Sequence, residues 1–246
     1  MKFNELSKEK QRATSAIIWR GKSPFDGADI MAIISGLKKP SDNAKTGAMA
    51  QVSIILADTH PVEGYKSGAD KAICGSCPLR LVGSDSGKRI CYVNVGFAEA
   101  SKFRAMMANS YIDMTPEEVG VILNYRGIGC RFGSYGDPAM LPFEILDTII
   151  RISGTKYTSY THQWQEPFFD SRHLRYSMAS VDHINTVETL SEIHPDARYY
   201  RLADNYENLA NNEVKCPSDK DKITCAKCGL CSGTKLQAKS VVIIEE

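Results

Sequence analysis

The feature that most constrains this chain is a run of three cysteines at two-residue spacing near its carboxyl end. Cys225, Cys228 and Cys231 follow Cys216-Pro217, so the group reads C-x8-C-x2-C-x2-C. Structural zinc sites normally use two C-x2-C pairs that lie far apart in sequence. Three successive thiolates with a remote Cys-Pro are typical of a ferredoxin-like cysteine motif, here with the Cys-Pro placed first. The pattern predicts one [4Fe-4S] cluster bound by these four cysteines, with zinc as the alternative.

A second group of cysteines lies upstream and is one ligand short. Cys74, Cys77 and Cys91 form a C-x2-C-x13-C pattern, and Cys130 lies outside both groups. Three thiolates buried together repel one another and stay protonated unless a cation holds them, so we expect a metal here, and a second iron-sulfur site rather than zinc. The fourth ligand is Cys130, a histidine, solvent or a substrate. In the other interpretation, Cys91 and Cys130 are small buried hydrophobes.

Composition excludes several classes of protein. The 246 residues are 43% hydrophobic and 24% charged, which is typical of a globular protein that folds without disulfides. Thirty basic against 29 acidic residues leave a net charge of +1, which argues against non-specific nucleic-acid binding. The sequence has no apolar run long enough to span a membrane and no apolar signal core near Met1. We therefore expect a cytoplasmic protein without membrane contact, in which clustered cysteines are metal ligands or catalytic thiols.

Strands and helices alternate along most of the chain. Expected strands cover residues 51–57, 130–135, 156–162, 176–181, 197–202 and 239–244, and expected helices cover 25–37, 97–109, the segment after the capping box at 115–118, 142–153 and 184–193. This alternation predicts an α/β fold of parallel strands, as an open sheet or partial barrel. We expect an α/β body over residues 1–204, with a cysteine-rich loop at 74–91, and a C-terminal cysteine-rich metal-binding module over 205–246.

Polar side chains follow the expected strands at their carboxyl ends. In parallel α/β folds these ends meet at one edge, where ligands bind. Asp137, His162 and Asp182 are therefore candidate catalytic residues, with His162 as a proton carrier, and Trp164 and Arg201 could line the same pocket. In the structural interpretation, the aspartates simply cap the elements that follow them.

Taken as a set, the motifs resemble an uncharacterised family of iron-sulfur or metal-binding proteins from tailed bacteriophages and mobile elements. The resemblance spans most of residues 45–235. It rests on Ile73-Cys74-Gly75-Ser76-Cys77-Pro78-Leu79-Arg80, Cys91-Tyr92-Val93-Asn94, Gly133-Ser134-Tyr135-Gly136-Asp137-Pro138, Tyr160-Thr161-His162-Gln163-Trp164, Met178-Ala179-Ser180-Val181-Asp182, and Cys216-Pro217 with Cys225, Cys228 and Cys231. The family implies iron-sulfur binding and a barrel-like α/β body but no particular reaction, and Cys130 lies outside its motifs. A phage-encoded protein of this kind would act in the host cytoplasm.

Two function classes follow. The first is an iron-sulfur protein, working either as an electron carrier with a redox partner or as an enzyme on a small ligand at the strand ends. The second is a zinc-stabilised interaction or nucleic-acid-binding module. It draws on a local excess of basic over acidic residues around the last cysteines, formed by Lys215, Lys220, Lys222, Lys227, Lys235 and Lys239 against Glu213, Asp219 and Asp221.

Overall fold

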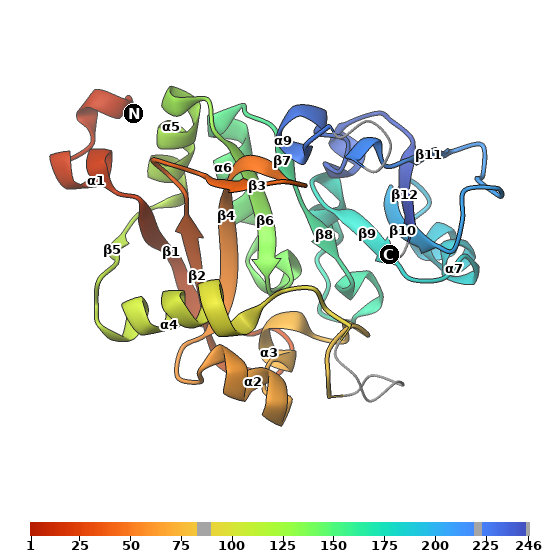
Figure 1. Cartoon of the computed structure of the whole chain (residues 1–246), viewed down its shortest axis with the longest axis horizontal. Coiled ribbons are helices and arrows are strands. Elements are labelled where there is room, and N and C mark those ends of the chain that lie inside the picture. The colour runs from red at the N-terminus through yellow and green to blue at the C-terminus, as the bar shows by residue number, and fades with distance from the viewer. Residues whose placement is uncertain (83–89, 219–222, 245–246) are drawn as a thin grey trace.

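The computed structural model is an α/β fold built on two sheets and describes residues 1–82, 90–218 and 223–244 (Figure 1). The first sheet has the strand order β5-β1-β2-β4-β6-β7, with β3 beside β4, and the second has the order β11-β12-β10-β9-β8. The strands are β1 (Ser15–Lys22), β2 (Asp29–Ser35), β3 (Ser41–Asn43), β4 (Gly47–Leu56), β5 (Ile112–Asp113), β6 (Gly129–Tyr135), β7 (Tyr157–Thr158), β8 (Tyr160–Thr161), β9 (Met178–Val181), β10 (Tyr199–Ala203), β11 (Glu213–Lys215) and β12 (Ser240–Ile244).

Helices and short helical turns connect these strands. The α-helices are α1 (Lys8–Arg12), α2 (Pro61–Ser67), α3 (Lys71–Cys74), α4 (Ala100–Met107), α5 (Pro116–Arg126), α6 (Phe143–Ser153), α7 (Asn185–Ile193) and α9 (Cys225–Cys228). A π-helix covers Val95–Glu99, and 3-10 helices cover Phe3–Glu5, Pro138–Met140, Gln163–Gln165, Ser171–Arg175 and Gly233–Lys235. Over the described ranges, none of these helices is both long and apolar enough to cross a membrane.

The sheets are mixed, with a long parallel part. β1, β2, β3 and β4 pair antiparallel, whereas β4, β6 and β7 pair parallel. In the second sheet β8, β9, β10, β12 and β11 are all parallel. The predicted α/β class is therefore confirmed. The sheet continues past residue 204, because β12 of the tail pairs with β10 of the body.

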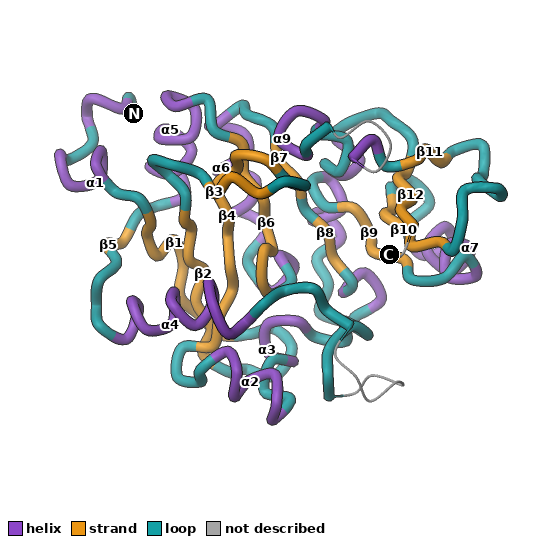
Figure 2. The backbone as a smooth tube through the Cα atoms, in the orientation of Figure 1, coloured by secondary structure: helices purple, strands orange, loops and turns teal. Residues whose placement is uncertain are grey.

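One segment joins the two sheets. β7 pairs with β6 and β8 pairs with β9, and only Ser159 separates β7 from β8. The Ser159 N–H donates to the Cys231 carbonyl (3.2 Å), and the Ser159 carbonyl accepts from the Met178 N–H (2.9 Å). Figure 2 shows the strands of both sheets following one another across the molecule. Residues 157–161 therefore lie at the junction of the two sheets.

The helix expected over residues 25–37 is wrong. Asp29–Ser35 forms strand β2 between β1 and β4, and Ile30, Ala32 and Ile33 are buried. A short continuous apolar run fits a doubly covered strand as well as a helix, so periodicity alone does not separate the two. Strand β1 follows a polar start and was not expected.

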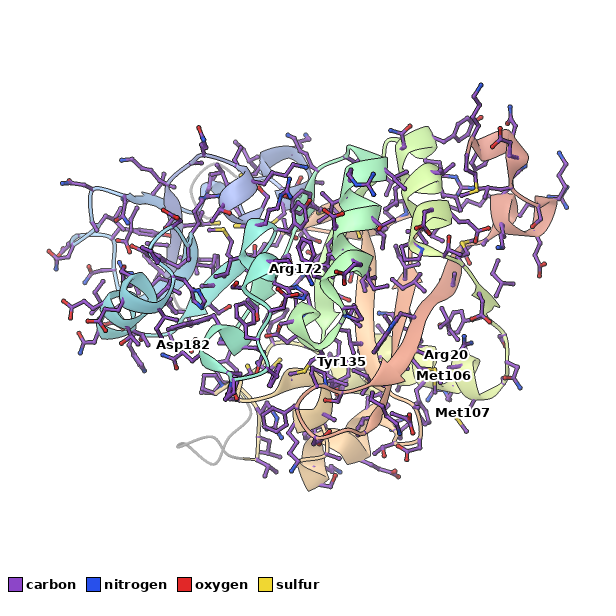
Figure 3. The ribbon with its side chains drawn as sticks, turned by 180° about the vertical axis from the view of Figure 1, so that it is seen from behind. Arg20, Met106, Met107, Tyr135, Arg172 and Asp182 are labelled. Atoms are coloured by element: carbon purple, nitrogen blue, oxygen red, sulfur yellow. The ribbon has the colours of Figure 1, made fainter. Side chains whose placement is uncertain are left out.

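Helices α5 and α6 pack together over the first sheet, as Figure 3 shows from behind. Their contact is close at Gly120, where a Cβ would lie 2.7 Å from the Cβ of Ile152. Ile122, Leu146 and Ile149 are fully buried in the main core beneath them. This packing fixes the parallel strands whose ends carry the candidate site.

Candidate functional site

The carboxyl ends of β6, β8 and β9 bring the three predicted catalytic residues close together. Figure 3 shows Tyr135, which ends β6, and Asp182, which follows β9, at a similar level of the molecule. Asp137 Oδ2 accepts hydrogen bonds from the His162 backbone N–H (2.8 Å) and from Gln163 Nε2 (3.3 Å), and Oδ1 accepts from the Ala139 N–H (2.9 Å). Asp137 thus caps the 3-10 helix that follows it, and its hydrogen bond to His162 joins the ends of β6 and β8.

His162 lies between a carboxylate and a thiol. Its Nε2 is 3.4 Å from Asp182 Oδ1, and its ring also hydrogen-bonds the Cys77 side chain. Burial alone would lower the pKa of His162, but these hydrogen bonds raise it well above its usual value of 6.5. A thiol, an imidazole and a carboxylate from three different segments therefore form one connected group.

Trp164 and Arg201 have other contacts. Trp164 Nε1 donates to the Ser180 carbonyl (2.9 Å) within the core of the second sheet. Arg201 forms a buried two-point ion pair with Glu213, with Nε–Oε1 at 2.7 Å and Nη2–Oε2 at 2.8 Å. Both residues are structural here, and the predicted pocket does not include Arg201.

The upstream cysteine loop lies against the same strand ends. Gln163 Oε1 accepts from the Ser76 N–H (3.2 Å), Gln163 Nε2 donates to the Cys74 carbonyl (2.8 Å), and the Asp137 N–H donates to the Ile73 carbonyl (2.7 Å). Gly75 has φ +53°, and the Gln163 amide occupies the space that a Cβ there would need. The hydrogen bonds that hold the loop against the strand ends are therefore made by its backbone groups.

Two positioning residues of this loop were not predicted from the sequence. Gln163 and Arg80 each lie within one of the motifs named above, but the sequence assigned no role to either. Arg80 donates to Asp70 Oδ1 (Nη2, 2.6 Å), to the Gly75 carbonyl (3.1 Å) and to the Gly68 carbonyl (2.8 Å). No spacing rule identifies a side chain whose role is to bond distant backbone, so the sequence carried no signal for either.

The upstream thiols interact with one another. Burial raises the pKa of Cys74 well above its usual value, and the neighbouring Cys77, Asp70, Cys91 and Asp137 raise it further. The Cys91 N–H donates to the Leu79 carbonyl (2.9 Å), which returns the chain to this loop after residues 83–89, which lie outside the described residues. All three upstream cysteines are thus near the strand ends.

The C-terminal cysteines lie elsewhere, around α9. The Cys225 and Ala226 N–H groups donate to the carbonyls of Lys45 and Thr46, just before β4 begins. Figure 1 places α9 and α3 at opposite ends of β6. Cys216 and Cys231 are buried beside Met178, Val241 and Ile243. Helix α9 and the upstream loop therefore occupy opposite ends of the first sheet.

The four C-terminal thiols are close enough to affect one another electrostatically. Burial raises the pKa of Cys231 to about 12, and Cys216, Cys225 and Cys228 contribute to that rise. Burial, Cys216 and Cys228 also raise the pKa of Cys225, whereas Arg131 and Lys45 oppose the rise. The Tyr160 side chain hydrogen-bonds Cys231. The four thiols come from two segments and therefore lie near one another and near the positive charges of Arg131 and Lys45.

Cys130 joins neither group. Its side chain is 1% exposed in the main core, and burial is the only cause that raises the pKa of its thiol. No cysteine of either group contributes to that shift. This placement matches the interpretation of Cys130 as a small buried hydrophobe.

Neither cysteine group is a closed metal site. Across residues 1–82, 90–218 and 223–244, no three or more Cys, His, Asp or Glu side chains are arranged so that they could hold a metal ion.

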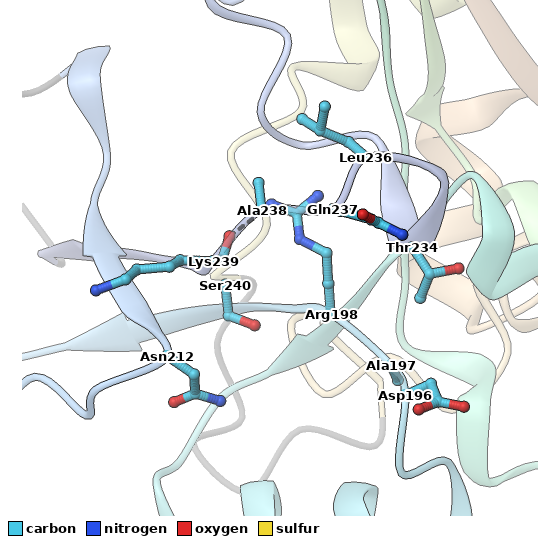
Figure 4. A pocket seen from close by; sticks show the side chains of 10 residues that line it. All are labelled: Asp196, Ala197, Arg198, Asn212, Thr234, Leu236, Gln237, Ala238, Lys239 and Ser240. Carbon is cyan, nitrogen blue, oxygen red and sulfur yellow. Dashed lines mark hydrogen bonds between the residues drawn. The ribbon is translucent and has the colours of Figure 1, made fainter.

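A separate pocket of about 660 Å³ lies beside the beginnings of β10 and β12 (Figure 4). Arg198 lines it and donates to the carbonyls of Gly233 (2.8 Å) and Lys239 (2.5 Å). None of the predicted catalytic or metal-binding residues lines this pocket.

The fold and the two thiol groups define an α/β protein with cysteine-rich loops at separate places on its sheets. No protein-family model matches the chain, and no curated protein or solved structure matches it at a significant level. The functional argument therefore depends on the residues themselves.

Proposed function

We propose that the protein binds one [4Fe-4S] cluster through Cys216, Cys225, Cys228 and Cys231 and uses it for electron transfer. The observation that carries the proposal is the convergence of these four thiols, each within electrostatic range of others, in one partly buried neighbourhood. Thiolates are the ligands that iron-sulfur clusters use, and the triplet spacing suits three corners of a cubane.

The surroundings of the group fit an anionic cluster. Arg131 and Lys45 lie near Cys225, and Arg198 lies near Cys231. The Tyr160 hydroxyl is placed to donate to the Cys231 sulfur, and hydrogen bonds to ligand sulfurs help to set the reduction potential of such clusters. An apolar wall of Met178, Val241 and Ile243 limits access by water.

The position of α9 favours electron transfer over direct substrate binding. The polar strand ends lie at the other end of the first sheet, so a small ligand bound there would not contact a cluster at α9. In this proposal the cluster exchanges electrons with a redox partner or with a ligand at the strand ends.

The test is metal analysis after anaerobic purification. We expect a brown protein with broad visible absorption and about four iron atoms and four sulfides for this cluster. Cys228→Ala should lose this iron, whereas Cys130→Ala, which removes a thiol outside both cysteine groups, should retain it. A colourless protein with stoichiometric zinc and no iron would overturn the proposal.

The nucleic-acid alternative receives less support. Lys215 lies over the ring of Tyr206 (4.6 Å) and Lys235 over that of Tyr176 (5.5 Å), while Glu213 is paired with Arg201. Lys220, Lys222, Asp219 and Asp221 lie outside the described residues. Zinc without iron in the metal analysis is the result that would favour this second class.

A further inference from the structure

We propose that the pocket beside the beginnings of β10 and β12 binds the oxyanion group of a small molecule, a carboxylate or a phosphate, through the Arg198 guanidinium. The pocket has a volume of about 660 Å³, which is within the range of small-molecule sites. Within the described part of the chain, no cysteine lines it, and neither do the strand-end residues Asp137, His162 and Asp182. The site is therefore separate from both thiol groups and does not depend on the proposed cluster.

Three parallel strands bring polar residues to one edge of this pocket (Figure 4). Arg198, Lys239 and Asn212 directly precede β10, β12 and β11, and β12 lies between the other two strands. The register of both parallel pairs, extended back to these residues, sets Lys239 opposite Arg198 and Asn212. The Ser240 N–H donates to the Asn212 carbonyl (2.8 Å), and the Ser240 hydroxyl accepts from the Tyr199 N–H (3.1 Å). Strand pairing therefore holds two cations and an amide at the same edge of the second sheet.

Arg198 is a buried cation without an acidic partner in the described chain. It is only 7% exposed, its two terminal nitrogens donate to the carbonyls of Gly233 (2.8 Å) and Lys239 (2.5 Å), and its buried Nε has no hydrogen-bond partner among the described residues. Burial lowers the pKa of Arg198, and no carboxylate of these residues opposes that effect. Arginine is almost never fully buried unless it is paired. The unpaired charge therefore favours an anion that the described chain does not supply.

The chemistry of a guanidinium selects oxyanions over other ligands. Its planar fork matches two oxygens of a carboxylate or phosphate, and such charged hydrogen bonds are stronger than neutral ones. With one carbonyl on each terminal nitrogen, Arg198 retains N–H donors for an incoming oxyanion. Lys239 adds a second positive charge to the lining, whereas Asp196 and Leu236 add a negative charge and an apolar surface. A single oxyanion on a small, partly apolar molecule therefore fits this lining better than a polyanion does.

Arg198 also has a structural role, which explains only part of its setting. Its two carbonyl partners lie at the ends of the segment 233–239, and Thr234 and Gln237 of that segment form part of the pocket wall. The hydrogen bonds of Arg198 therefore shape the pocket. A neutral donor would hold the same carbonyls at a lower cost of desolvation, because burying a charge costs more than burying a polar group. The positive charge is the feature that the structural role leaves unexplained.

The experiment is isothermal titration calorimetry on the anaerobically purified full chain, with inorganic phosphate and acetate as separate probes in a background of about 0.15 M chloride. Wild-type protein should bind at least one probe saturably at one site per chain, and the tighter probe identifies the oxyanion. Arg198→Gln should weaken this binding by at least about tenfold, because it removes a charged donor. Lys239→Gln should weaken it by about two- to fivefold, as loss of an exposed charge does. Lys235→Gln is the matched control, since it removes the same charge outside the pocket and should leave the affinity unchanged.

The outcomes are separable from those of the proposed function. Because Lys239 is exposed, Lys239→Gln keeps the test valid if Arg198→Gln fails to fold. No saturable binding by the wild type, wild-type affinity in folded Arg198→Gln, or equal weakening by Lys235→Gln and Lys239→Gln would each overturn the inference. Loss of iron from Arg198→Gln with unchanged anion affinity would assign this guanidinium to the thiols instead. Zinc without iron at the cysteines would overturn the proposed function and leave this test unaffected.

Discussion

Cys130 and Cys231 are both buried thiols, but they differ in what surrounds them. Three other cysteines contribute to the raised pKa of Cys231, whereas burial alone raises that of Cys130. A thiol among thiols becomes stable as a thiolate only when a cation compensates the charge. Burial by itself therefore does not distinguish a metal ligand from a core residue, and the identity of the neighbours does.

At the residue scale, this difference predicts unequal effects of two alanine substitutions. Cys228→Ala should release the metal and lower the melting temperature, because bound metal contributes folding free energy. Cys130→Ala should cost only about 1 kcal/mol from a small cavity. Iron content and chemical unfolding of the anaerobic proteins measure both effects. Equal losses of metal and stability in the two variants would show that Cys130 is also a ligand.

A second residue-scale prediction concerns His173. Its Nε2 lies 3.1 Å from the Leu141 carbonyl, and within the described chain its buried Nδ1 has no hydrogen-bond partner. Burial lowers the pKa of His173 below 6.5 and outweighs the attraction of Asp170 and Asp137. The unfolded chain therefore binds the proton more readily, so this contribution to stability is complete above pH 6.5 and is lost as pH falls below it.

His173→Gln should flatten that pH dependence, because an amide can still donate to Leu141 without taking up a proton. The measurement is the urea midpoint of both proteins between pH 7.5 and 5, with values compared as differences. We expect the wild type to lose more stability than the variant across this interval. Parallel curves would contradict the assignment.

At the element scale, strands β10 and β11 are connected by a buried ion pair across β12. Arg201 contacts both oxygens of Glu213, and the Tyr199 hydroxyl donates to Oε1 (3.1 Å). Burial would raise the pKa of Glu213, but hydrogen bonds from Arg201 and from the Ala210 N–H lower it. The pair holds β11 directly before Cys216, so it positions a proposed cluster ligand.

Glu213→Gln should lower the free energy of unfolding by about 3–5 kcal/mol, because it leaves a buried guanidinium without its counter-charge. The double substitution Arg201→Met with Glu213→Leu should be less damaging, since no buried charge remains. Denaturant unfolding at neutral pH compares the three proteins. A double variant as unstable as Glu213→Gln would show that packing, and not the unpaired charge, causes the loss.

Sequence patterns predicted the elements with strong local signals. The capping box at Thr115 and Glu118 begins α5 as expected, and the apolar run over 239–244 becomes β12. The run over 25–37 failed because its apolar residues are buried on both faces of a central strand. The antiparallel pairing of β1, β2 and β4 depends on contacts between distant segments, which local periodicity does not encode.

The sequence likewise predicted one part of the candidate site and missed another. Parallel topology correctly predicted that Asp137, His162 and Asp182 approach one another at the strand ends, while their catalytic role stays a prediction. The approach of Cys77 to His162 was not predicted, because 84 intervening residues separate them and only the folded strands bring them together. Residue types indicated thiol chemistry at both groups, but only the structure separates the two locations.

For the whole molecule, two separate sites predict two separable losses of metal. Replacing Cys74, Cys77 and Cys91 together should remove the metal expected at the upstream cysteines and leave the C-terminal iron, whereas replacing Cys225 and Cys228 should do the reverse. Elemental analysis of the two full-length variants and the wild type measures this. Wild-type protein with about twice the iron of the upstream variant would support the second iron-sulfur site expected from the sequence, whereas unchanged metal content in that variant would contradict it.

Residues 157–162 connect the two sites within a single short stretch of backbone. Ser159 bonds to Cys231 at the sheet junction, and His162 follows three residues later between Cys77 and Asp182. If metal binding at one site shifts this stretch, thermodynamic reciprocity requires each metal to change the affinity of the other by the same factor. Through the short segment between β7 and β8, metal binding at one site would then change the metal affinity measured at the other.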